Sequence, residues 1–111
     1  MKISIAQLKR HLPVGQEFKA EFIGAVNIRV FGNKGVTDLK RSQEEIVTKR
    51  RVEKQSSEMA SRILTGPDKD KLIYLTWKGI EARLESYPEQ KDFVILTHKE
   101  NKEDFLKITV D

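Results

Sequence analysis

The chain has 111 residues, 34% of them charged and 38% hydrophobic, so we expect a single compact domain over 1–111 with a thin core under a charged surface. It contains no cysteine, which excludes disulfides and thiolate chemistry and suits a cytoplasmic location. No apolar run reaches the roughly 20 residues needed to cross a bilayer, so we expect no contact with a membrane.

The net charge of +4 is concentrated in the first part of the chain. Residues 1–64 contain thirteen Lys and Arg against seven Asp and Glu, whereas residues 65–111 contain eight against ten. This asymmetry permits a polyanionic partner, because lysine and arginine gain by displacing counterions from phosphates.

The first predicted elements are a short helix and alternating strands. Apolar residues at i, i+3 and i+7 predict a helix over about 5–12, with Ser4 as its N-cap and Pro13 as its stop. The alternation of apolar and polar residues in QEFKAEFIG and again in VNIRVF then predicts half-buried strands.

Helix and strand compete in the middle of the chain, over 42–64. Ser42 and Glu45 have the spacing of a helical capping box, but the apolar residues that follow form an untidy helical stripe. A Gly-Pro-Asp turn at 66–68 between two extended segments instead predicts a β-hairpin. We favour strand for about 47–64, and the helical alternative stays open.

The last third of the chain is easier to interpret. KGIEARLESYPEQ predicts a helical turn, because Ile80, Leu84 and Tyr87 recur at i, i+4 and i+7. DFVILTH and DFLKITV, joined by the charged KENKE, predict two strands. The whole is an α+β, strand-dominated fold: a short N-terminal helix and about five antiparallel strands in a curved sheet or small open barrel.

The residues offer little for catalysis, so we expect a non-enzymatic protein without metal or cofactor. His11 and His98 stand beside no plausible nucleophile, and most carboxylates alternate with basic residues, as on a solvated surface. The Asp68-Lys-Asp70 loop lacks the spacing of a calcium-binding EF-hand, and we expect it to be a turn.

The most suggestive stretch is TKRRVEK, residues 48–54, which holds four basic side chains. On a regular strand Arg50 and Lys54 would share one face, and Lys49 and Arg51 the other. One interpretation is a positive track for nucleic-acid phosphates. The alternative is an edge strand that its charges protect from aggregation.

Two further residues extend the candidate track. Arg62 would add a charge, and Trp77 at a strand end could stack on a nucleobase, although core packing competes for it. The candidate nucleic-acid-binding residues are therefore Lys49, Arg50, Arg51, Lys54, Arg62 and Trp77.

Three segments, RRVEKQSSEM, LIYLTWKGIE and the DFVIL–FLKITV hairpin, together resemble small uncharacterised proteins of bacteriophages and prophages over about 47–110. The residues that match are Arg51, Lys54, Gln55, Ser56, Trp77 and Lys78. Glu58 and Gly79 depart from the pattern. The resemblance implies a mostly β domain of phage origin in the host cytoplasm, and it brings no activity with it.

We therefore expect a small binding domain that contacts nucleic acid with weak, salt-sensitive and sequence-tolerant affinity. The alternative is a protein-interaction module, an inhibitor or adaptor of a host or phage protein, which could add an edge strand to its partner's sheet. Self-association into a larger particle is a third interpretation, and the sequence leaves the oligomeric state open.

Overall fold

The computed structural model describes residues 1–23, 47–99 and 101–110, which form one helix and one antiparallel sheet. The helix is α1 (Ile5–His11). The strands are β1 (Lys2–Ile3), β2 (Glu17–Ile23), β3 (Val47–Gln55), β4 (Glu58–Ile63), β5 (Leu72–Thr76), β6 (Ile80–Glu85), β7 (Phe93–His98) and β8 (Asn101–Val110). Within the described residues the order across the sheet is β1-β6-β7-β8-β2-β3-β4-β5.

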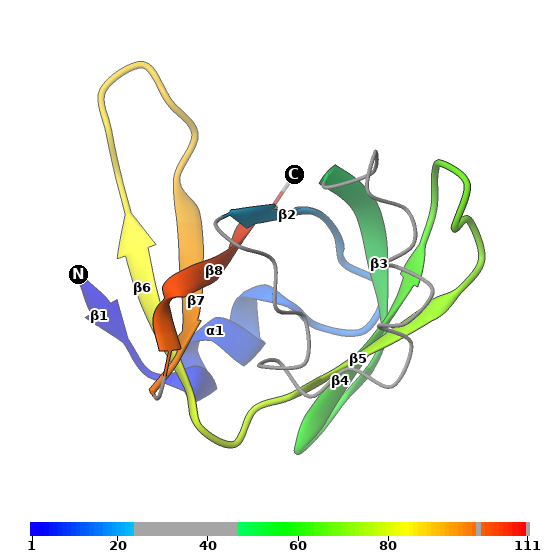
Figure 1. Cartoon of the computed structure of the whole chain (residues 1–111), viewed down its shortest axis with the longest axis horizontal. Helices are drawn as coiled ribbons and strands as arrows, with labels where there is room; N and C mark the ends of the chain where they lie inside the picture. Colours follow the sequence, from blue (N-terminus) through cyan, green and yellow to red (C-terminus); the bar gives the residue numbers. More distant parts are fainter. Residues whose placement is uncertain (24–46, 100, 111) are drawn as a thin grey trace.

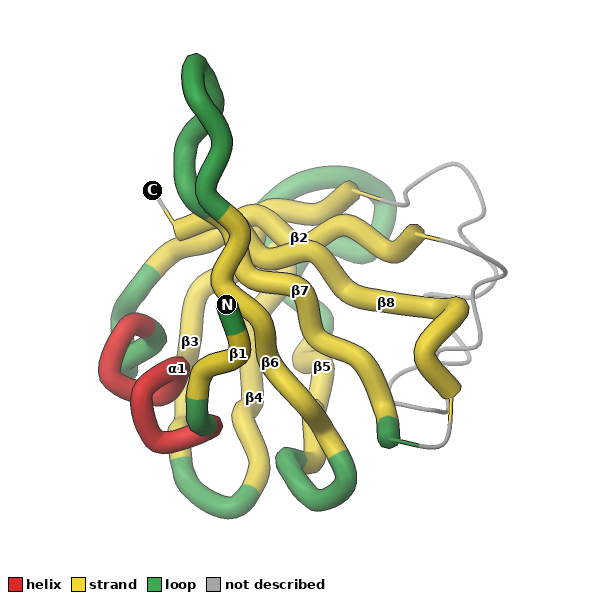
Figure 2. Tube along the Cα trace, turned by 90° about the vertical axis from the view of Figure 1, so that its left-hand side faces the viewer, coloured by secondary structure: helices red, strands yellow, loops and turns green. Residues whose placement is uncertain are grey.

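The sheet is strongly curled. β5 stands at one end of the strand order, yet residues 77–79 connect it directly to β6, which is next to the last strand at the other end. Accordingly, β6, β7 and β8 stand on one side and β3, β4 and β5 on the other, with α1 between them (Figure 1). Figure 2 shows the same curled sheet from the side of β1 and β6. The predicted strand-dominated class with one short helix is confirmed, but the described part has eight strands rather than about five.

The helix α1 begins and ends where the sequence predicts. The Ser4 hydroxyl accepts a hydrogen bond from the Gln7 backbone N–H at 3.1 Å, and the Gln7 side chain accepts one from the Ser4 N–H at 2.8 Å. This capping box satisfies two N–H groups at the first turn. Leu8 and Leu12 are fully buried, so one face of the helix anchors it to the sheet.

The disputed middle of the chain is strand wherever the structure describes it. The single strand expected over 47–64 is a hairpin, in which β3 turns at Ser56 and Ser57 into β4. The predicted hairpin around the Gly-Pro-Asp turn is present as β4 and β5. The VNIRVF segment and the capping box of Ser42 and Glu45 lie outside the described residues.

The helical turn expected after Trp77 is wrong, because residues 80–85 form strand β6. Ile80, Ala82 and Leu84 alternate with Glu81, Arg83 and Glu85, and this strand pairs with β7 over its whole length. An apolar residue at every second position also satisfies the i, i+4 spacing of a helix, so the pattern fits both structures.

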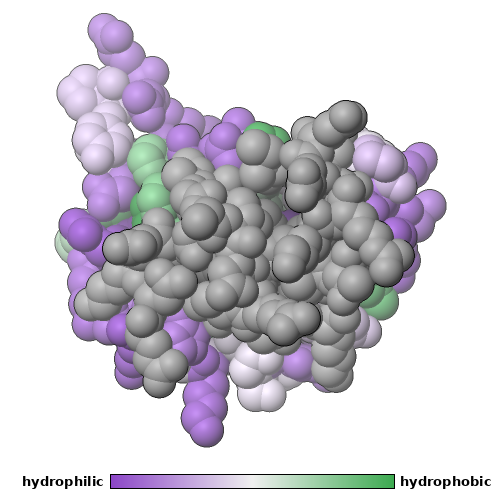
Figure 3. Space-filling view, viewed as in Figure 1, coloured by the Kyte–Doolittle hydropathy of each residue, from purple (hydrophilic) through white to green (hydrophobic). Residues whose placement is uncertain are grey.

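The core fills the space between the concave side of the sheet and α1. Its buried residues are Leu8, Leu12, Phe18, Ala20, Val52, Met59, Ile63, Ile73, Leu75, Trp77, Ile80, Ala82, Val94, Leu96, Leu106 and Ile108. On the face of the molecule seen in Figure 3, the described residues are mostly hydrophilic, and hydrophobic ones show only in small areas.

Candidate nucleic-acid interface

Strand β3 lies inside the sheet, between β2 and β4, and this position decides where its basic residues point. Thr48, Arg50 and Val52 are buried on the concave side, whereas Lys49 and Arg51 lie on the outer side. The interpretation of this stretch as a charge-protected edge strand is wrong, because β3 is paired along both edges.

Arg50 is buried, with an exposed fraction of 2%. Its Nε donates a hydrogen bond to the Thr48 hydroxyl at 2.8 Å, and its neighbours across the sheet are Phe18 and Ile63. Burial lowers the pKa of Arg50 from 12.5 to about 10, since the charged guanidinium loses its water. The prediction that Arg50 offers its charge to a ligand at the surface is therefore wrong.

Arg51 and Arg62 face each other across β3 and β4 on the outer side of the sheet. Glu53 lies between them: its Oε1 atom accepts from Arg51 Nη2 at 2.8 Å and from Arg62 Nε at 3.1 Å. These hydrogen bonds, first that from Arg51 and then that from Arg62, lower the pKa of Glu53. The hydrogen bond to Glu53 in turn raises the pKa of Arg51. We call Arg51, Glu53 and Arg62 the outer triad.

Lys49 and Lys54 flank the outer triad along β3. Lys49 Nζ lies 3.6 Å from a carboxylate oxygen of Glu17, and both side chains are about half exposed. Lys54 is exposed and opposite Ala60, because the pairing register shifts between Val52 and Lys54. This irregularity overturns the expectation that Lys54 shares a face with Arg50, since an extra residue reverses the alternation of a strand.

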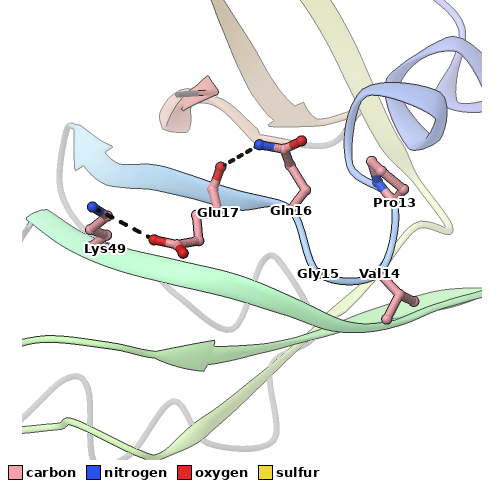
Figure 4. Close-up of a pocket in the computed structure, with 6 residues that line it drawn as sticks. All are labelled: Pro13, Val14, Gly15, Gln16, Glu17 and Lys49. Atoms are coloured by element: carbon pink, nitrogen blue, oxygen red, sulfur yellow. Dashed lines mark hydrogen bonds and ion pairs between the residues drawn. The ribbon is translucent and has the colours of Figure 1, made fainter.

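A shallow hollow adjoins Lys49. It has a volume of about 750 Å³, and its walls are Lys49, Glu17 and the loop over residues 13–16 (Figure 4). The loop is fixed to β3, because Gly15 N–H donates to the Val52 carbonyl at 2.7 Å and Val52 N–H donates to the Gln16 carbonyl at 2.9 Å. These two hydrogen bonds fix the wall of the hollow beside the basic residues.

Trp77 is not an exposed platform. Its exposed fraction is 6%, and its indole N–H donates to Gln55 Oε1 at 2.8 Å. Gln55 in turn donates its Nε2 to the Leu12 carbonyl at 3.2 Å, at the end of α1. Trp77 therefore packs in the core and is linked through Gln55 to the end of α1, and the idea that it stacks on a nucleobase is wrong.

The structure brings four of the six predicted residues together on one surface. We call this surface the outer basic face: Lys49, Arg51 and Lys54 of β3 with Arg62 of β4. The sequence missed Glu17 and Glu53 as the acidic partners of these cations. The alternation of charges along β3 was the available signal for Glu53, whereas Glu17 meets Lys49 only through strand pairing.

Two other kinds of site receive no support from the described ranges. Within them no group of three His, Asp or Glu side chains could hold a metal ion. None of the helices in the described part is long and apolar enough to span a membrane. Comparisons with protein-family models, with curated proteins and with solved structures give no match, so the resemblance to phage proteins stays a prediction.

Proposed function

We propose that this protein is a non-enzymatic binding domain that contacts nucleic-acid phosphates through the outer basic face. The observation that carries the proposal is the pairing of Arg51 with Arg62 across two adjacent strands, with Lys49 and Lys54 beside them. Two carboxylates, those of Glu17 and Glu53, form ion pairs with three of these four cations, and Lys54 is exposed beside them.

The outer triad can bind a phosphate although Arg51 and Arg62 already form ion pairs with Glu53. A guanidinium carries five N–H donors in a planar fork, and among the described residues Arg51 contacts Glu53 through Nη2. Glu53 thereby holds Arg51 in one orientation on the outer side of a rigid sheet. Contacts to phosphate alone position a strand without reading its bases, so the binding is sequence-tolerant.

Fluorescence anisotropy tests the proposal. Labelled single-stranded DNA, duplex DNA and RNA are titrated with the protein at several salt concentrations. The logarithm of the affinity for duplex DNA should fall by about 0.9 for each phosphate contact per tenfold rise in salt. The paired variant Arg51→Glu with Lys54→Glu should abolish binding, because it reverses two charges at the centre of the outer basic face.

The matched control is Lys78→Glu with Lys99→Glu. Both lysines are exposed, lie in the β5–β6 and β7–β8 connections and do not belong to the outer basic face. This variant changes the net charge by the same amount, so its binding should persist. Equal loss of binding in both variants would show a response to net charge alone and would refute a site on β3 and β4.

A second function follows from the position of β5 in the sheet. Within the described residues β5 is the last strand of the sheet and pairs only with β4. Its backbone can accept a strand from a partner protein, as in β-augmentation. The interaction module that the sequence suggests would then use β5 rather than β3.

A Thr76→Pro variant tests this route, because proline removes a backbone donor at the edge. Loss of a stoichiometric partner recovered from nuclease-treated lysate would support it.

A further inference from the structure

A pocket of about 720 Å³ opens between α1 and the concave side of the sheet, away from the outer basic face. Its floor is aliphatic, formed by residues that point inward from four strands. They are Ile3, Leu84, Val94, Ile108 and Val110. Three of these, Ile3, Leu84 and Val110, are only partly buried, so the core leaves part of its aliphatic surface open to this pocket.

The mouth of the pocket is polar and carries more positive than negative charge. Arg10 and His11 border it from the last turn of α1, and Lys91 and Asp92 border it from the segment before β7. The Asp92 carboxylate accepts a hydrogen bond from the Ser86 hydroxyl at 2.7 Å. Arg10 is exposed, and its Nε lies 3.4 Å from the Ala6 carbonyl.

We infer that this pocket binds a single-chain amphiphile with an anionic head group, such as a medium-chain carboxylate. An aliphatic floor removes an alkyl chain from water, which is favourable in proportion to the apolar area buried. A guanidinium at the mouth can hold a carboxylate through paired hydrogen bonds. The volume lies within the range of about 300–1,000 Å³ usual for small-molecule sites.

This ligand site is independent of the proposed function. The floor residues face the concave side of the sheet, whereas the outer basic face is on the opposite side of the same sheet. A protein that fails to bind nucleic acid can still bind the amphiphile, and the reverse holds equally.

The test compares two probes that share one alkyl chain. Decanoate and decyltrimethylammonium, both below their micelle concentrations, are titrated into the full chain at pH 8. Binding is followed by calorimetry and by backbone amide shifts in NMR spectra. Decanoate should bind with one-to-one stoichiometry and about tenfold more tightly than the cation, with shifts confined to α1 and the strands that line the pocket, β1, β6, β7 and β8. Absence of binding, equal binding of both probes, or shifts centred on β3 and β4 would overturn the inference.

Two variants separate the floor from the mouth. Leu84→Trp fills the pocket and should abolish decanoate binding. Arg10→Gln removes the head-group contact on an exposed helix face and should weaken binding by about threefold to tenfold. Lys9→Gln is the matched control, since Lys9 belongs to the same helical turn and does not border the pocket. Equal weakening by Lys9→Gln and Arg10→Gln would refute the role of Arg10, even if Leu84→Trp fails to fold.

Discussion

Two neighbouring arginines on opposite sides of strand β3 differ in burial and in the direction of their pKa shift. On the concave side Arg50 is buried against Phe18 and Ile63, and the loss of water lowers its pKa to about 10. On the outer side Arg51 is solvated, and its hydrogen bond to Glu53 raises its pKa. One residue along a strand thus separates an arginine whose pKa burial lowers from one whose pKa a hydrogen bond to Glu53 raises.

This difference shows why a cluster of basic residues in a sequence is not yet a basic surface. Successive side chains of a strand point to opposite faces, so every second residue of a consecutive basic run points toward the core when one face is buried. The outer basic face also depends on Arg62 from strand β4 and on the register shift that turns Lys54 outward. The binding surface is a property of strand pairing rather than of TKRRVEK alone.

The largest expected effect comes from reversing the buried charge. Arg50→Glu should lower the free energy of unfolding by about 3–5 kcal/mol, because it places a carboxylate at a buried position beside the apolar side chains of Phe18 and Ile63. Urea unfolding followed by circular dichroism measures this loss. Lys54→Glu makes the same change of charge at an exposed position, and its unfolding midpoint should stay close to that of the native chain. Similar losses of stability in Arg50→Glu and Lys54→Glu would contradict the conclusion that Arg50 is buried and Lys54 is exposed on the other side of β3.

A smaller effect is expected at the hydrogen bond between Trp77 and Gln55. Trp77→Phe removes the indole N–H and leaves Gln55 Oε1 without that donor, so we expect a loss of about 1–3 kcal/mol. A double-mutant cycle with Gln55→Leu measures the coupling between the two side chains by thermal unfolding. Nucleic-acid affinity should remain unchanged, because Trp77 is buried. Weaker binding in a variant that retains its stability would show that Trp77 reaches the ligand after all.

Local rules explain which parts of the fold the sequence could predict. The helix α1 was predictable because its cap, its apolar spacing and the following proline agree. β2 was predictable because its alternation has a single solution. β6 was misinterpreted, since Ile80 and Leu84 fit both a helical and a strand pattern. β1 has only two residues, too few for any periodicity.

The candidate site depended on facts that local patterns do not contain. The irregularity after Val52 leaves no clear sign in the sequence, yet it decides the direction of Lys54. The burial of Arg50 depends on β3 having neighbours on both sides. Phe93, the first residue of FVILTH, is only partly buried, and Lys107 Nζ lies 4.3 Å from the centre of its ring. In FVILTH both faces are apolar at the start, so the inward face had no distinguishing mark.

The smallest expected effect concerns the outer triad and appears through pH. The pKa of Glu53 is lowered in the folded state, so its contribution to stability is present above the unfolded value of about 4.5 and disappears as pH falls through the folded value. Thermal unfolding of the native chain and of Glu53→Gln should therefore differ slightly at neutral pH and converge in acid. Glu58→Gln, the same change at an outer position of β4, controls for the loss of one carboxylate.

At neutral pH Glu53→Gln should also strengthen nucleic-acid binding by about twofold to fivefold, because Arg51 and Arg62 lose their competitor for the phosphate. Weaker binding would mean instead that Glu53 is needed to hold Arg51 in place, and the outer triad would then act as one preorganised unit.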